Sequence, residues 1–374
     1  MGVPTFSSRK AKTVVGLDIE AASVAATEVI VNGDVRLGRS GIAPLAAGVS
    51  REGEVGDPAA LTAAIKDLFA EHKLSRNVRL GIANQRVVVR TLRLPMIEDE
   101  GELETAIRFQ AQEDMPMPLE QAVLDWQVCS SDPEVRGAGK MDVVVVAARR
   151  DMVSNLAHVV RDAGLRPIGL DVSAFALIRA LGSDAPTAPA PQPSYEDRAD
   201  QGEGVELMSA GAAQLLCNLG DITNLVVSRN GDCLFTRVSP FGIEGIAQRL
   251  AERRELTLEH ARQWLDHVGA EAPLETIDGD PALVAATRDV LEDGVAKLAD
   301  ELRLSLDFYG AQEGARSIEE IVVCGPGSVI PGLPEQIERQ LGYALRVGRP
   351  PALSGLDAAS AARLTVPYGL ALEE

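Results

Sequence analysis

The same local pattern occurs twice in this chain, about two hundred residues apart. An apolar run leads through a turn of small and hydroxyl-bearing residues into a second β-rich run, first over 14–23 and again over 215–224. In both copies the second strand ends in an Asn-Gly pair, at 32–33 and at 230–231, which is a preferred sequence for a tight β-hairpin. A hairpin unit that is repeated in this way predicts two related lobes with a duplicated fold.

The repeated turns also carry residue types that hold phosphate. Backbone N–H groups and a Ser or Thr hydroxyl in such a turn can point at phosphate oxygens. The first turn offers Asp18 and Ser23, and the second offers Asn218, Gly220 and Thr223. A third glycine turn, Gly325-Pro326-Gly327-Ser328, follows an apolar strand pattern, and its glycines let the backbone approach a flat ligand closely. Together the three turns predict a nucleotide cleft between the lobes.

Length, charge and cysteine content exclude several classes of protein. The length of 374 residues predicts two to three domains. The net charge of −19 argues against a nucleic-acid partner and against adsorption to anionic lipid. The four cysteines are scattered without metal-ligand spacing, so we expect reduced, buried thiols. There is no signal-peptide pattern and no apolar run long enough to span a bilayer, so we expect a cytoplasmic protein without direct membrane insertion.

Changes of pattern along the chain predict its domain organisation. The stretch after Pro95 differs in texture from what precedes it, with an acidic helix over 98–113, an extended segment over 115–118, strands over 123–128 and 141–148, and a helix over 152–163. A proline-rich and acidic stretch follows later and cannot bury enough apolar area to order itself. We therefore expect lobe I over 13–94 and 166–182, an inserted subdomain over 95–165, a flexible loop over 183–204, lobe II over 205–350 and a C-terminal return to lobe I over 351–374.

Within these units we expect three further features. Asp57-Pro58 should begin a helix, because Asp is a good N-cap and Pro suits the first turn. We also expect two more strands, over 78–83 and 87–94, and a short closing helix over 366–372.

Four motifs give the chain a family resemblance: VGLDI at 15–19, LRLPM at 92–96, AIRFQAQE at 106–113 and GPGSVIPGL at 325–333. Their order resembles the actin-like ATPase superfamily and, within it, the PilM family of type IV pilus assembly, which is related to the division protein FtsA. The resemblance covers about 13–372. It implies an α/β, actin-like (ribonuclease H-like, duplicated) two-lobed fold, with an inserted subdomain placed as in FtsA.

The resemblance also implies ligands and a partner. ATP with Mg²⁺ would bind in the interlobe cleft, and the cytoplasmic N-terminal tail of a PilN-like inner-membrane protein would dock on lobe I and the inserted subdomain. The protein would then lie at the inner membrane through its partners. Whether it forms a homo-oligomer, and whether it serves a pilus, secretion or competence system, is left open.

Site residues follow by matching positions to the family pattern. Asp18 is expected to hold Mg²⁺ through water, and Ser23 to contact a phosphate. The other implied nucleotide-binding residues are Asn218, Gly220, Thr223, Gly242, Glu301, Gly325, Gly327 and Ser328. The structural alternatives are that Asp18 and Ser23 stabilise their turn, and that Glu301 lies on a solvated helix face.

Three positions depart from the family pattern. Glu20 stands where a glycine is usual, Asn218 where an aspartate precedes the second turn, and Leu265 where a lysine commonly faces the nucleotide. Asn brings no negative charge to hold a metal or orient a water, although Asp221 could substitute in part. We therefore expect weak or absent ATP hydrolysis, with nucleotide binding retained.

The inserted subdomain carries the expected partner surface. Methionine-rich surfaces suit adaptable peptide docking. The candidate residues are Pro95, Met96, Phe109, Met115 and Met117. The alternative is that most of them form the core of the subdomain.

Three functions compete on this fold. The first is a scaffold that binds ATP and a partner's tail. The second is an active ATPase or a sugar-kinase-like phosphotransferase, which would need a second acid that Asn218 does not supply. The third is an FtsA-like division protein, which would carry a C-terminal amphipathic membrane helix that this sequence does not show after its last fold element.

Overall fold

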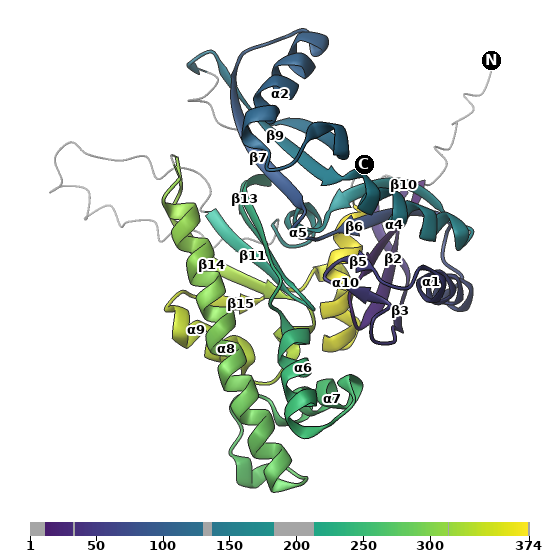
Figure 1. Ribbon diagram of the computed structural model, residues 1–374, viewed down its shortest axis with the longest axis vertical. Coiled ribbons are helices and arrows are strands. Elements are labelled where there is room, and N and C mark those ends of the chain that lie inside the picture. The colour runs from purple at the N-terminus through teal and green to yellow at the C-terminus, as the bar shows by residue number, and fades with distance from the viewer. Residues whose placement is uncertain (1–11, 33, 130–136, 183–212, 313, 373–374) are drawn as a thin grey trace, which may run out of the picture.

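Two lobes with the same sheet topology make up most of the molecule (Figure 1). The computed structural model describes residues 12–32, 34–129, 137–182, 213–312 and 314–372. The strand order is β10-β6-β1-β2-β3 in lobe I and β13-β12-β11-β14-β15 in lobe II. The duplicated, two-lobed α/β fold expected from the repeated hairpins is confirmed. The proline-rich and acidic segment over 183–204 lies outside the described residues.

Each lobe is an antiparallel meander extended by two parallel strands. In lobe I the meander consists of β1 (Lys12–Ile19), β2 (Ser23–Asn32) and β3 (Asp34–Pro44). β6 (Asn77–Ile82) pairs in parallel with β1, and β10 (Arg166–Val172) pairs in parallel with β6. In lobe II the meander runs β11 (Ala213–Leu219), β12 (Thr223–Arg229), β13 (Asp232–Ser239), and β14 (Ile318–Cys324) and β15 (Leu345–Val347) follow. Small elements complete the lobes: β4 (Ser50–Arg51), β5 (Glu54–Val55), η3 (Leu274–Thr276), η4 (Pro326–Val329) and η5 (Pro351–Leu353).

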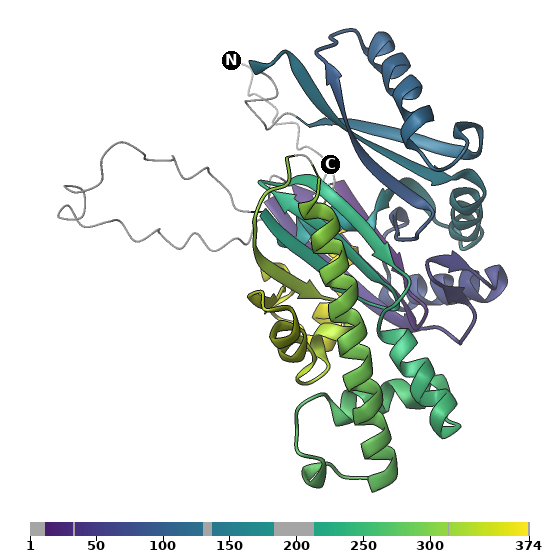
Figure 2. The same ribbon diagram turned by 60° about the vertical axis from the view of Figure 1, so that its left-hand side comes forward.

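Helices cover both faces of both sheets, so the central strands are nearly continuous apolar runs. On the outer face of lobe I lie α1 (Pro58–His72) and α4 (Arg150–Asp162). The outer face of lobe II carries α6 (Ile243–Arg254), α8 (Pro281–Gly310) and α9 (Leu333–Leu341), with α7 (Leu258–Val268) beside α6 and α8 (Figure 2). Between the sheets lie α5 (Ser173–Leu181) and α10 (Ala358–Ala371).

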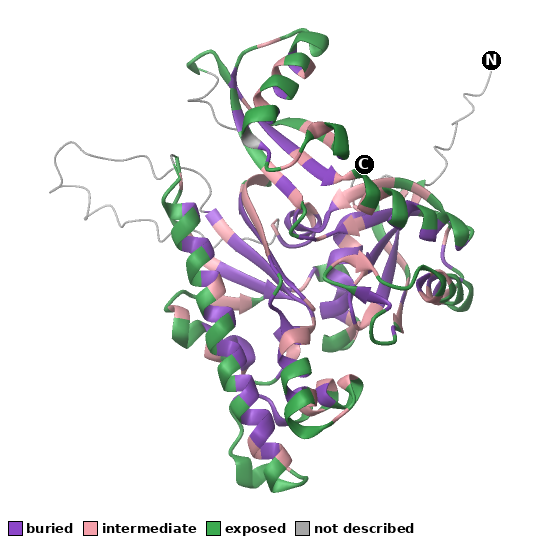
Figure 3. Ribbon diagram, in the orientation of Figure 1, coloured by how far each residue is buried: buried purple, intermediate pink, exposed green. Residues whose placement is uncertain are grey.

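Local sequence signals explain where these helices begin and which face they bury. The Asp57 carboxylate accepts hydrogen bonds from the backbone N–H of Ala59 and Ala60, and caps α1 as expected. One side of α8 is apolar and buried along its length, while the other side is exposed (Figure 3). The closing helix α10 is longer than the expected 366–372, because Pro367 is accommodated inside it.

The inserted subdomain is a three-stranded antiparallel sheet of β7 (Val87–Pro95), β9 (Lys140–Arg149) and β8 (Ala122–Cys129), in that order, with α2 (Glu100–Asp114) packed on one face. A short turn of helix, η1 (Leu119–Gln121), leads into β8. The strands expected over 78–83 and 87–94 are confirmed as β6 and β7, but the two strands belong to different sheets. β6 lies between β1 and β10, and β7 pairs with β9 along its whole length. β7 includes exposed residues, as suits a strand at the edge of a sheet, whereas β6 is mostly buried.

Candidate functional site

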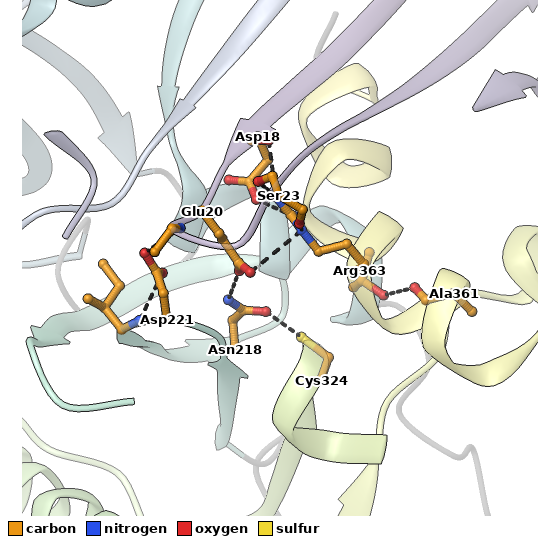
Figure 4. Close-up of polar contacts among 11 residues, drawn as sticks. Asp18, Glu20, Ser23, Asn218, Asp221, Cys324, Ala361 and Arg363 are labelled. Atoms are coloured by element: carbon orange, nitrogen blue, oxygen red, sulfur yellow. Dashed lines mark hydrogen bonds and ion pairs between the residues drawn. The ribbon is translucent and has the colours of Figure 1, made fainter. Parts of the chain in front are cut away.

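The two repeated turns meet across the boundary between the lobes. The backbone N–H of Ala21 donates a hydrogen bond to Asp221 Oδ2 at 2.9 Å. Asn218 Nδ2 donates to Glu20 Oε1 at 3.2 Å (Figure 4). Each bond joins a residue of the β1–β2 turn to lobe II, either to Asp221 in the β11–β12 turn or to Asn218 near the end of β11, so the structure brings the two predicted turns together.

The third predicted turn, at 325–328, packs from the side of lobe II against the residues where the two repeated turns meet. We call this group of residues the turn cluster. Gly325 has a φ of +83°, and a Cβ at this position would lie 2.3 Å from Asn218 Oδ1. Asn218 Oδ1 also accepts a weak hydrogen bond from Cys324 Sγ at 3.8 Å. A glycine is therefore required here both by the backbone conformation and by the approach of the Asn218 side chain.

The residue that dominates this cluster is Arg363 of α10, which the sequence analysis missed. Its Nη1 donates to Asp18 Oδ2 at 2.6 Å, and its Nε donates to Ser23 Oγ at 2.7 Å. Its Nη2 donates to the backbone oxygens of Asp18 and Ser23 at 3.2 and 2.9 Å. The sequence does hold a signal, since Arg363 is a single charge within an otherwise apolar helical stretch. Such a charge is almost never buried without a partner.

Burial and charge shift the titration of this cluster. Asp18, Glu20 and Arg363 are each less than a tenth exposed. Burial raises the pKa of Glu20 to about 7, although Arg363 opposes the shift, and burial raises the pKa of Asp221 to about 6. Burial disfavours the charge on Arg363, but the carboxylates of Glu20 and Asp18 outweigh that effect and raise the pKa of the guanidinium.

Two side chains that were expected to bind nucleotide, those of Thr223 and Ser328, donate hydrogen bonds to backbone carbonyls in this structure. Thr223 Oγ1 donates to the carbonyl oxygen of Phe241 at 2.7 Å, and Ser328 Oγ donates to that of Gly325 at the same distance. Both side chains are buried, so their hydroxyls hold the turns in shape. Gly242 begins α6 against the second turn, where a Cβ would lie 2.5 Å from the carbonyl oxygen of Gly220.

The remaining predicted residues lie on the wall of lobe II or away from the cluster. Gly327 packs on Ile243, where a Cβ would lie 2.7 Å from the Ile243 Cδ1 atom. Glu301 on α8 pairs with Arg237 of β13 at 3.3 Å, outside the contacts of the turn cluster. Leu265 is a core residue of lobe II. Lys297, which the sequence analysis did not single out, lies 4.0 Å from the ring centroid of Phe241, directly before Gly242.

The residues at the expected metal position do not fit a hydrated Mg²⁺. The Asp18 carboxylate is paired with Arg363, and the Ser23 hydroxyl accepts a bond from the same guanidinium. The cavity beside Asp18, Glu20, Asn218 and Asp221 has a volume of about 30 Å³, which is room for water. In the part of the chain that the structure describes, no group of three or more His, Cys, Asp or Glu side chains is arranged to hold a metal ion.

The expected partner residues divide into exposed and buried members. Phe109 on α2 is 67% exposed and Met96 is 48% exposed, which is unusual for such large apolar side chains. Pro95 is also exposed, and Met117 is half-buried against the subdomain core. The expectation that Met115 belongs to the partner surface is wrong. Its side chain is buried in the subdomain core with Leu103 and Ile107.

Comparison with known protein families and solved structures shows what this chain is similar to. The family model described as type IV pilus assembly protein PilM matches residues 16–364. A solved structure titled "PilM-PilN type IV pilus biogenesis complex" is 26% identical, covers 96% of this chain and 97% of that chain, and superposes with a TM-score of 0.75. The ethanolamine utilization protein EutJ from Carboxydothermus hydrogenoformans is 14% identical, covers 98% of this chain and 91% of that chain, and has a TM-score of 0.51.

The duplicated sheets, the turns that meet between the lobes and these structural matches define a protein with a two-lobed, actin-like fold. The inserted subdomain lies between β6 and β10 of lobe I in the chain order. Because the family model spans nearly all of the sequence, the chain belongs to the PilM family of type IV pilus assembly proteins. Within the described residues, none of the helices combines the length and the apolar character needed to cross a bilayer.

Proposed function

We propose that this chain is a cytoplasmic actin-like adaptor of type IV pilus assembly, or of a related secretion or competence system, which binds the cytoplasmic N-terminal tail of a PilN-like membrane protein. The observation that carries this proposal is the match to the PilM–PilN complex, which extends over 96% of the chain at a TM-score of 0.75. The match includes the inserted subdomain, so the part of the fold expected to receive the tail is present. Binding to the tail would hold the protein at the inner membrane.

Exposed apolar side chains on the subdomain support a docking role. Phe109 lies on the face of α2 that is turned away from Leu103 and Ile107, the residues that pack on the sheet. Together with Met96, it would supply the aromatic and methionine contacts that often anchor a bound peptide. We therefore place the tail against these two residues and Pro95.

Catalysis is not part of the proposed function. Asn218 carries no charge to orient a water, and its side chain is already engaged by Glu20 and Cys324. The hydroxyls of Thr223 and Ser328 are engaged with backbone carbonyls. We infer that ATP hydrolysis is absent, and that any purine nucleotide bound on the glycine wall of lobe II would lack the metal contact expected from Asp18.

Peptide binding tests the adaptor function. A fluorescently labelled peptide with the N-terminal sequence of the PilN-like protein from the same organism should bind the full chain saturably in an anisotropy titration. Replacing a central aromatic anchor costs about 2 kcal/mol, so Phe109→Ala should weaken binding about thirtyfold. Phe308→Ala is the matched control, because Phe308 is 59% exposed but lies on α8 of lobe II, and it should leave the affinity unchanged. Absence of binding, or equal losses in both variants, would contradict the proposal.

A further inference from the structure

Arg363 contacts the carboxylate of Asp18, the residue that the family resemblance assigns to Mg²⁺. Its guanidinium is inserted from α10 into the β1–β2 turn, where it reaches the Asp18 carboxylate, the Ser23 hydroxyl and two backbone oxygens (Figure 4). The Glu20 carboxylate lies 3.5 Å from its Nε. All three of its nitrogens are thus directed at oxygen atoms of one turn.

The burial of this arginine requires that set of partners. Arg363 is 6% exposed, and an isolated charge in such surroundings is strongly destabilising. The fork of donors in a guanidinium matches several oxygens at fixed angles, which a lysine ammonium does not. The site is therefore built around the guanidinium and is complete with it.

The same turn makes the contacts between the lobes. Glu20 accepts from Asn218, and the N–H of Ala21, one residue further on, donates to Asp221. Lobe II approaches so closely that a Cβ at Gly220 would lie 2.4 Å from Glu20 Oε1. The position of the turn, which Arg363 fixes, thus determines whether these interlobe bonds form.

We propose that Arg363 is a built-in counter-cation that takes the place of the divalent metal at Asp18, so that the two lobes close through Glu20–Asn218 and Ala21–Asp221 without a metal-bound nucleotide. This inference goes beyond the adaptor function and does not depend on it. In this chain, lobe closure is a fixed property of the fold, and the cleft excludes the Mg²⁺–triphosphate group because its cation position is already filled.

Hydrogen–deuterium exchange of the full chain tests the proposal on the wild-type protein. The amides of Ala21 and Ile222, which donate to the two oxygens of Asp221, should be protected without nucleotide. Adding Mg²⁺ with ATP should leave that protection unchanged. If Mg²⁺ with ATP increases protection at these amides, closure depends on the nucleotide and the proposal is overturned. This measurement does not depend on the folding of any variant.

Substitution of the arginine gives the complementary test. In Arg363→Ala, exchange at Ala21 should accelerate at least about tenfold, because the turn loses the cation that holds it. Mg²⁺ alone should raise the melting temperature of this variant, because it can neutralise the carboxylates of Asp18 and Glu20 that have lost their cation. It should not raise the melting temperature of the wild type. Arg288→Ala is the control: Arg288 is equally enclosed but donates to the carbonyls of Val268, Gly269 and Ala272 in lobe II, so Mg²⁺ should not stabilise its variant. Equal responses of both variants to Mg²⁺, or unchanged exchange at Ala21, would refute the counter-cation role.

Discussion

Glu20 should make the stability of this protein fall as pH rises through neutrality. Burial raises the pKa of the Glu20 carboxyl from 4.5 to about 7 in the folded protein, with further raising by the nearby Asp221 and Asp18 carboxylates. Arg363 and the hydrogen bond from Asn218 act in the opposite direction. Because the folded pKa lies above the unfolded one, the folded state binds the proton more tightly. The associated stability is present below the unfolded pKa and is lost as pH rises from about 4.5 to about 7.

The size of the effect follows from the difference between the two pKa values. Each pKa unit corresponds to about 1.4 kcal/mol, so Glu20 alone should lower the free energy of unfolding by about 2 kcal/mol between about pH 5 and pH 8. The Glu20→Gln variant keeps the shape of the side chain and an oxygen that can accept from Asn218, but it does not ionise. Relative to wild type, it should therefore gain about 2 kcal/mol between those two pH values.

Urea unfolding followed by circular dichroism at the two pH values measures this gain. Glu244→Gln is the matched control, because Glu244 is a part-buried carboxylate that is paired with Arg262 in lobe II and not with Arg363 or Asn218. It should show the same pH dependence as the wild type. Parallel pH profiles for Glu20→Gln and wild type would refute the assignment of a buried, proton-binding carboxyl to Glu20.

Two further substitutions test how tightly the site is packed. Gly16→Ala should lower the free energy of unfolding by about 3 kcal/mol in urea titrations, because its Cβ would lie 1.9 Å from the carbonyl oxygen of Pro367 in α10. Gly355→Ala, whose Cβ would meet no neighbour, should be near neutral, and equal effects would contradict this packing. Thr223→Val should cost about 1–2 kcal/mol by the same measurement, because it leaves the Phe241 carbonyl without its partner, whereas the exposed Thr105→Val should cost little.

The fold could be predicted largely because its signals are local and repeated. The Asn-Gly hairpins, the Asp57-Pro58 helix start and the apolar stripe of α8 each depend on neighbouring residues only. The duplicated topology follows once the two hairpin units are recognised. The strand that pairs with β7 could not be predicted, because two strands that are adjacent in the sequence can belong to different sheets. Which sheet a strand joins depends on the elements that pack against its two faces.

The chemistry of the site was harder to predict because its decisive contacts are distant in the sequence. Arg363 and Asp18 are separated by 345 positions, and no local pattern indicates that they pair. The structure brings the residues of the predicted turns together, but the contacts that each side chain makes depend on competing partners. The hydroxyls of Thr223 and Ser328 donate hydrogen bonds to nearby backbone carbonyls, and the Met115 side chain packs in the subdomain core.

The packing of α10 against β1 and β2 has a consequence for how the protein is made. These strands are synthesised long before the helix that covers their inner face. During synthesis the early strands therefore keep an uncovered apolar surface while more than three hundred residues are added. Lobe I can reach its native form only after α10 has been synthesised, so its apolar inner face stays exposed during this part of synthesis.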